Sequence, residues 1–289
     1  MDSKSLTTRE VARLCRVSDA TVKRWEEAGL IQSERTSGGH RRFRAEEIAR
    51  FQREIGLGLK TCHGDESITN AASRRRPNKS HSSCAFFQSI VAGCETESAN
   101  ILINAFLQGE PLAKIFDESV SRALCRVGEL WFNGELSVTQ EHLATRSAFN
   151  ALYKLRSVLP ITESNHKLAM CCAMEGDLHE LPPFLAQMTL ENLGFEVVNF
   201  GANTPLYSFA EEVLQFSPAL VCVSATVMEN VERASRDYKD FRAQFAKIKT
   251  SVVLGGRAFN EQNITRRFPA ELRARTFTEL AAFAQVLGK

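Results

Sequence analysis

The sequence predicts a multidomain protein with a winged helix-turn-helix, a four-helix bundle and an α/β domain whose doubly wound, parallel sheet has five strands. Three observations predict this organisation. Residues 1–55 hold two short helical patterns and a turn-rich hairpin, residues 82–162 repeat apolar side chains at helical spacing, and residues 163–289 alternate short apolar runs with helical patterns. A chain of 289 residues, 44% of them apolar, is long enough to give each domain a core.

Positive charge is concentrated near the N-terminus. The net charge of the chain is only +2, but residues 1–53 contain twelve lysines and arginines against eight aspartates and glutamates. A local positive face on a nearly neutral chain favours nucleic acid as the partner of the N-terminal part. No apolar run approaches the ~18 residues of a membrane-spanning helix, and no signal peptide opens the chain, so we expect a cytoplasmic protein that binds no membrane.

The first domain, residues 1–55, has the signals of two short helices and a wing. Thr7 and Glu10 have capping-box spacing, Ser18 caps a second helix that ends at Gly29, and the paired glycines of RTSGGHRRFR allow a hairpin tip. A charged surface in contact with water alone is the alternative to a DNA-binding face. The candidate DNA-contacting residues are Thr8, Arg9, Ser18, Thr21, Lys23, Arg24, Arg35, His40, Arg41, Arg42 and Arg44.

The run TTREVARLCRVSDATVKRWEEAGLIQSERTSGGHRRFR closely resembles the DNA-binding domain of the MerR family of bacterial regulators. This resemblance implies a winged helix-turn-helix that binds, as a dimer, to a palindromic site in double-stranded DNA. Many MerR proteins continue into one long dimerisation helix. Here residues 56–81 are rich in Gly, Ser, Asn and charge and are expected to form a linker, so we expect weak dimerisation until something else holds the subunits together.

Cysteines do not indicate a disulfide framework or a zinc site. The eight cysteines form no CxxC pair, and Cys62, His63, His81 and Cys84, in or beside the linker, fit no tight zinc spacing.

Residues 82–162 are expected to form the helical bundle, in which one helix face is marked by Leu112, Ile115, Phe116, Val120, Leu124 and Val127.

In residues 163–289 the expected strands are KLAMCCA, FEVVNF, ALVCVSAT, SVVLGG and ARTFTE. A Rossmann-like parallel sheet binds ligands outside the carboxyl ends of its strands, and His179 follows the first strand.

Small and polar residues accompany His179 at the expected strand ends. Asp177 lies two residues before His179, where its carboxylate can hold one ring nitrogen and leave the other for a metal. Small residues at the ends of the third and fourth strands would give a bulky planar ligand room: Ser224, Thr226, Gly255 and Gly256. A surface histidine before two prolines is the alternative.

Together these residues resemble the cobalamin-binding domain, with its DxHxxG motif, a small-residue strand end and a GG pair. The resemblance implies that His179 is the lower axial cobalt ligand and that Ser224, Thr226, Gly255 and Gly256 line the groove for the nucleotide tail. Two positions depart from the pattern. Pro182 replaces the glycine of the motif, and Val227 follows Thr226 where the family has a different residue.

The helical region carries a third motif, W-x9-EH, in Trp131, Glu141 and His142. A core tryptophan followed by an exposed helix start is the structural alternative. The motif and the domain order resemble the CarH/LitR family, MerR-type regulators that use adenosylcobalamin as a light sensor. The resemblance implies that Trp131 covers the upper face of the corrin and that Glu141 and His142 contact the adenosyl group.

This resemblance implies a mechanism. Adenosylcobalamin would join the bundle to the α/β domain, promote a homodimer or tetramer, and let several DNA-binding domains repress one promoter until light breaks the cobalt–carbon bond. Family members have a histidine directly after the tryptophan, whereas Phe132 cannot coordinate a metal, so no second histidine ligand is expected at that position.

Two rival functions remain open from the sequence. One is a MerR-type regulator whose sensor domain is degenerate, senses cobalamin without light, or uses another chromophore or a protein partner. The other is a corrinoid enzyme, but no segment is long enough for the barrel that binds substrate in such enzymes, so we expect no enzyme.

Overall fold

The computed structural model describes residues 5–15, 18–27, 29–36, 38–44, 47–48, 51, 79–245, 248–260 and 264–288. Most of the linker expected at residues 56–81 lies outside these ranges, and so do Cys62 and His63. The chain forms two compact units, one from Met1–Ile101 and Arg122–Leu152 and the other from Leu102–Ser121 and Tyr153–Lys289. None of the helices in the described ranges is long and apolar enough to span a bilayer.

The N-terminal domain is a winged helix-turn-helix, as predicted. It contains β1 (Ser5–Thr7), α1 (Thr8–Cys15), α2 (Asp19–Glu27), β2 (Glu34–Arg35) and β3 (Arg41–Arg44). The strands form an antiparallel sheet in the order β1-β3-β2, in which β1 is a strand that the sequence did not predict. Val11, Val22, Ile31 and Phe43 are buried between the helices and the sheet.

The predicted helix signals of this domain are confirmed. The backbone N of Thr7 donates to Glu10 Oε2 at 2.7 Å and the backbone N of Glu10 donates to Thr7 Oγ1 at 3.2 Å, which is the reciprocal pattern of a capping box. Ser18 Oγ accepts from the backbone N of Thr21 at 3.2 Å. Gly29 has a φ of 73°, as expected for the residue that ends a helix.

Four helices follow, and the third is irregular. They are α4 (Lys79–Val91), α5 (Glu95–Leu107), α6 (Leu112–Ile115) continued by the π-helical η1 (Phe116–Ser121) and by α7 (Arg122–Phe132), and α8 (Val138–Val158). Within the first unit α4 packs on α7, where the Arg126 guanidinium lies 4.4 Å from the centre of the Phe87 ring. Asn150 Nδ2 of α8 donates to Glu95 Oε1 of α5 at 2.6 Å.

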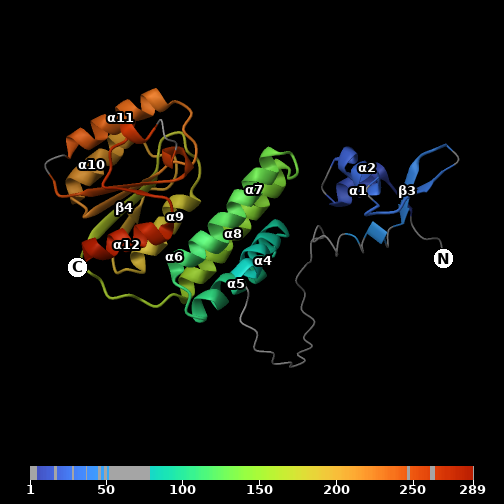
Figure 1. Cartoon of the computed structure of the whole chain (residues 1–289), viewed down its shortest axis with the longest axis horizontal. Coiled ribbons are helices and arrows are strands. Elements are labelled where there is room, and N and C mark those ends of the chain that lie inside the picture. Colours follow the sequence, from blue (N-terminus) through green and yellow to red (C-terminus); the bar gives the residue numbers. More distant parts are fainter. Residues whose placement is uncertain are drawn as a thin grey trace. The chain divides into compact units, whose positions relative to one another are not determined.

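The second unit contains the parallel sheet of five strands that the sequence predicts, in the order β5-β4-β6-β7-β8. Helices α9 and α12 cover one face and α10 and α11 the other (Figure 1). Strand β5 lies on one side of β4 and β6 on the other, so the order in which the parallel strands are added reverses between β4 and β6. The carboxyl ends of these two strands therefore flank the switch point where such sheets bind ligands. The elements are β4 (Leu168–Ala173), α9 (Leu181–Glu191), β5 (Glu196–Asn199), α10 (Leu206–Phe216), β6 (Leu220–Ser224), α11 (Val231–Gln244), β7 (Ser251–Gly255), η2 (Arg257–Asn260), η3 (Thr265–Arg267), β8 (Leu272–Ala274) and α12 (Phe277–Gly288).

The placement of the fifth strand in ARTFTE was wrong. The strand β8 ends at Ala274, and α12 begins at Phe277. Thr276 Oγ1 accepts from the backbone N of Glu279, and Glu279 Oε2 accepts from that of Arg275, which is a capping arrangement. Asp117 of η1 adds a second cap by accepting from the backbone N of Phe277 at 2.7 Å. A helix start, not a strand, therefore explains these threonines.

Candidate functional site

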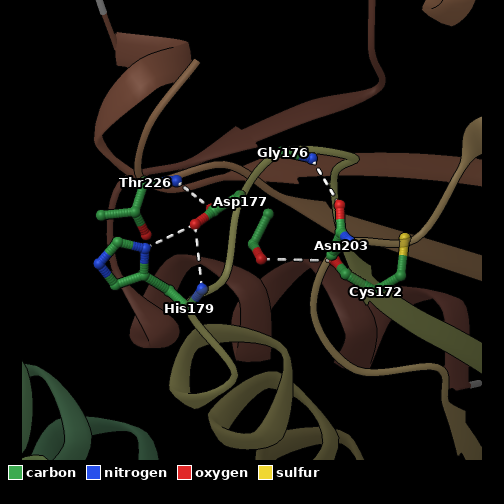
Figure 2. Close-up of polar contacts among 7 residues, drawn as sticks. Cys172, Gly176, Asp177, His179, Asn203 and Thr226 are labelled. Atoms are coloured by element: carbon green, nitrogen blue, oxygen red, sulfur yellow. Dashed lines mark hydrogen bonds and ion pairs between the residues drawn. The ribbon is translucent and has the colours of Figure 1, made fainter. Parts of the chain in front are cut away.

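The loop between β4 and α9 carries the predicted pair Asp177 and His179. We call residues 174–180 the histidine loop. Asp177 is only 1% exposed, and its Oδ1 lies 2.5 Å from His179 Nδ1 and 3.1 Å from the backbone N of His179. The His179 side chain is 52% exposed, and its second ring nitrogen points away from Asp177 (Figure 2). The structure therefore brings the two residues together as the sequence predicted.

The Asp177 carboxylate is a fixed negative charge. Burial raises its pKa, but hydrogen bonds from His179 and from the backbone N of Thr226 outweigh burial, so the pKa lies below its usual value. The Thr226 N–H donates to Asp177 Oδ2 at 2.6 Å. A carboxylate on Nδ1 favours the Nδ1–H tautomer of His179, which places the lone pair on Nε2, where a metal can accept it.

Two neighbouring strand ends hold the histidine loop in place. On the β6 side, the Met174 N–H donates to the Ser224 carbonyl at 2.9 Å. On the β5 side, the Asn203 N–H donates to the Asp177 carbonyl at 2.9 Å, and Asn203 Oδ1 accepts from the Gly176 N–H at 2.8 Å (Figure 2). Asn203 is not among the site residues predicted from the sequence, although an asparagine in the turn GANTP is a known signal for a left-handed residue.

The small residues expected beside the ligand have different structural roles. Ser224 Oγ is buried and donates to the Cys172 carbonyl at 3.4 Å, while Gly255 pairs with Ser224 in the sheet. Gly256 has a φ of 98°, and a Cβ there would lie 2.3 Å from the Ala225 carbonyl oxygen. At Gly255 the nearest such contact is 3.7 Å away. The fold itself therefore requires a glycine at 256 but not at 255.

The two departures from the family motif are compatible with this geometry. Pro182 lies in the first turn of α9, where proline costs no helical hydrogen bond. Val227 is exposed beside the switch point. Neither side chain displaces the histidine loop.

The W-x9-EH residues lie in the first unit, at the end of α7 and the start of α8. Trp131 is 46% exposed and Phe132 is 83% exposed, so Trp131 is not a core residue of its own unit. Glu141 Oε1 accepts from Thr145 Oγ1 at 2.7 Å, and Glu141 Oε2 lies 3.6 Å from His142 Nε2. A hollow of about 180 Å³ continues along α8 and is lined by His142, Thr145, Arg146 and Phe149. We call Trp131, Phe132, Glu141 and His142 the tryptophan end.

Most of the candidate DNA-contacting residues lie on the surface of the N-terminal domain. The exposed ones are Arg9, Ser18, Lys23, Arg24, Arg35, His40 and Arg44, while Thr8, Thr21, Arg41 and Arg42 are half-buried. Ion pairs engage two of the wing arginines: Arg41 Nε lies 2.8 Å from Glu26, and Arg44 lies 2.5 Å from Glu34. Hydrogen bonds from Ser33 and Arg41 lower the pKa of Glu26. Arg41 therefore also fixes the wing to α2.

Two family models match the N-terminal domain and the helical region that carries the tryptophan end. The model of the MerR family of regulatory proteins matches residues 7–43, and the model of a B12-binding domain matches residues 85–156. The HTH-type transcriptional repressor CarH of Myxococcus xanthus is 24% identical over 261 residues, which cover 84% of this chain and 84% of CarH. A dimethylamine corrinoid protein of Methanosarcina barkeri is 22% identical over 177 residues, 61% of this chain and 83% of that protein.

A solved structure is similar to the helical and α/β regions. The monomethylamine corrinoid protein of Methanosarcina barkeri superimposes with a TM-score of 0.59 at 19% identity, over 70% of this chain and 96% of that one. At this identity the likeness establishes the fold alone.

Proposed function

We propose that this chain is a MerR-type transcription regulator, not an enzyme, and that cobalamin held at His179 controls its binding to operator DNA, because the chain joins a region that matches the MerR family to a region that matches a B12-binding domain. The observation that carries this proposal is the pair of Asp177 and His179 at the switch point of the sheet. We further propose that the active form is adenosylcobalamin and that the regulator works in the cytoplasm as a repressor.

The histidine loop offers the His179 imidazole as a metal donor, which fits a metal whose other ligands belong to a cofactor. A bare transition-metal ion needs three or four protein donors, and no group of three His, Cys, Asp or Glu side chains that could hold a metal lies within the described ranges. One imidazole, oriented by a buried carboxylate, suits the cobalt of a corrin, whose ring supplies the equatorial nitrogens. Ser224, Thr226, Gly255 and Gly256 would then leave room for the nucleotide tail.

The tryptophan end is proposed to contact the upper ligand of the cofactor. An indole that is 46% exposed offers a flat apolar surface that a ligand can cover. Thr145 holds Glu141, and His142 is exposed beside it, so these two side chains can hydrogen-bond the ribose or purine of an adenosyl group. The similarity to CarH over both regions supports this assignment.

Control of DNA binding is proposed to occur through assembly. Bound cofactor would favour one arrangement of the subunit, and a dimer or tetramer of that arrangement would present several winged helices to one operator. Linked binding of this kind raises the apparent affinity without any new contact to DNA. The cofactor shifts the equilibrium only by its different affinity for the two arrangements.

Light is a separate part of the proposal. Adenosylcobalamin supplies, when bound, a cobalt–carbon bond that visible light breaks, so illumination would remove the adenosyl group that the tryptophan end contacts. The exposed Phe132 has no donor atom, which favours a second candidate function: a regulator that senses cobalamin but responds weakly or not at all to light.

The test is a titration of the purified apoprotein with adenosylcobalamin in darkness, followed by absorption, by sedimentation and by the shift of labelled operator DNA. We expect a cofactor-dependent increase in assembly size and operator affinity, and their reversal under green light. His179→Ala is the matched control and should lower cobalamin affinity at least about 10-fold. Operator binding that ignores cobalamin would contradict the proposal, and an assembly that persists under light would leave the second candidate.

A further inference from the structure

We propose that Asn203 is a positioning residue for His179, whose side-chain oxygen fixes the histidine loop and so sets the direction of the metal-binding nitrogen. This inference rests on the proposed function, because it concerns cobalamin held by His179. Asn203 is not part of the motifs that indicated the site, and it contacts the histidine loop from the opposite side to Thr226 (Figure 2).

Asn203 makes two bonds to consecutive residues of the histidine loop. Its backbone N–H donates to the Asp177 carbonyl at 2.9 Å, and its side-chain Oδ1 accepts from the Gly176 N–H at 2.8 Å. Gly176 has a φ of 86° and Asn203 a φ of 52°, so both turns use left-handed backbone. Among the residues with side chains, asparagine adopts this conformation most readily.

The loop that carries Asn203, between β5 and α10, is hydrogen-bonded to the end of β4. The Ala173 N–H donates to the Gly201 carbonyl at 2.7 Å, and the Thr204 N–H donates to the Ala173 carbonyl at 2.9 Å. These bonds attach the loop before α10 to the end of β4, immediately before the histidine loop begins. The Asn203 side chain on this loop can therefore hold the Gly176 backbone at a fixed place relative to the sheet.

The two anchors restrain different parts of Asp177. Thr226 binds its carboxylate and the Asp177 N–H closes a turn on the Met174 carbonyl at 2.9 Å, whereas Asn203 ties the backbone at Gly176 and Asp177 to the loop before α10. Together the two restraints fix the carboxylate plane, and that plane sets the orientation of the His179 ring. Removal of the outer partners that orient a metal-binding histidine typically lowers metal affinity by about 10–100-fold. We expect loss of the Asn203 amide oxygen to lower cobalamin affinity by about the same factor.

A purely structural role predicts a different result. If asparagine is present only because the turn needs a left-handed residue, then glycine, which adopts this conformation freely, should replace it without loss. Gly176 is exposed, so water can replace the lost acceptor and the fold should survive. The variant Asn203→Gly thus removes the amide oxygen and keeps the turn, and Asn203→Asp keeps an acceptor at the same reach.

The experiment uses the full chain of the wild type and three variants, produced with nitrogen-15 histidine and loaded with cob(II)alamin. Electron paramagnetic resonance of cob(II)alamin shows a doublet when its axial nitrogen is a labelled histidine and a triplet when it is the unlabelled base of the cofactor. Cobalamin affinity is measured by absorption. Hydrogen exchange of residues 174–180 in the apoprotein reports loop order without any cofactor.

We expect Asn203→Gly to raise the dissociation constant about 10-fold or more, to reduce the doublet fraction, and to speed exchange of the histidine loop. The melting temperature should fall by no more than about 4 °C. Asn203→Asp should restore the doublet. Asn199→Ala is the matched control, because Asn199 Oδ1 also accepts from a glycine N–H, that of Gly201 at 2.9 Å, but no hydrogen bond joins its side chain to the histidine loop.

Each outcome decides the inference. An unchanged doublet and affinity in Asn203→Gly overturn it, and so does an Asn203→Asp variant as impaired as the glycine variant. Equal losses in Asn199→Ala also overturn it, since they assign the effect to general loosening of the loop. A wild type that binds no cobalamin overturns the proposed function itself, which is a different result from a wild type that binds while its variants are unchanged.

Discussion

The histidine loop and the tryptophan end are organised in opposite ways. Side-chain and backbone hydrogen bonds from two flanking strand ends hold the histidine loop, and Asp177 at its centre is buried. At the tryptophan end the indole and the Phe132 ring are exposed, and Glu141 is held from within its own helix by Thr145. One region is therefore ordered before any ligand binds, whereas the other exposes apolar surface that a ligand can cover.

This difference suits a sensor. If His179 holds the cofactor as proposed, its preorganisation lowers the ordering cost of binding, because little conformational freedom is lost there. The tryptophan end, which is proposed to respond to the upper ligand, would need few internal restraints, since each would oppose its response. We therefore expect substitutions in the histidine loop to alter fold or affinity, and substitutions at the tryptophan end to alter selectivity with little cost to the fold.

The largest effect should come from Gly256→Ala, directly after β7. Its Cβ would meet the Ala225 carbonyl oxygen at 2.3 Å in a left-handed backbone, so we expect a loss of about 3 kcal/mol or more in the free energy of unfolding. Gly255→Ala meets nothing closer than 3.7 Å and should change stability by less than about 1 kcal/mol. Chemical denaturation of both apoproteins measures the contrast, and equal stabilities would show that the strand end is less rigid than described.

Asp177→Ala should have the next largest effect. It leaves the Thr226 N–H and the His179 Nδ1 without their carboxylate, so we expect cobalamin affinity to fall about 10–100-fold. Removal of a buried charged acceptor should also cost about 1–3 kcal/mol of stability. Titration by absorption and thermal unfolding measure the two losses. The combination of normal affinity with lowered stability would restrict Asp177 to a structural role.

The parts that the sequence predicted are those set by local patterns. The capping box of Thr7 and Glu10 and the Asp177–His179 pair depend on residues two or three positions apart, so spacing alone was sufficient. Strands β4 to β7 were recognisable as apolar runs. What escaped prediction depends on contacts distant in sequence: β1 pairs with β3, Asn203 binds Gly176, and Asp117 caps α12 from 160 residues away.

Trp131→Ala tests the other side of the comparison. Because the indole is already 46% exposed, we expect the apoprotein to lose no more than about 1 kcal/mol of stability. Affinity for adenosylcobalamin should fall about 10-fold, which corresponds to about 1.4 kcal/mol of lost apolar contact, while affinity for hydroxocobalamin should change far less. Competition between the two corrinoids measures this selectivity. Equal losses for both would show that Trp131 does not distinguish the upper ligand.

The smallest effect on stability should accompany Phe132→His. The Phe132 side chain is 83% exposed, so its replacement should change the free energy of unfolding by less than about 0.5 kcal/mol. The imidazole adds a donor that phenylalanine lacks, and if the tryptophan end faces the cofactor, the variant should retain corrinoid after illumination more firmly than the wild type does. Filtration of illuminated protein, with absorption of the retained fraction, measures this. Phe132→Leu controls for loss of the ring, and identical retention by all three proteins would place residue 132 away from the cofactor and remove the tryptophan end from the proposed site.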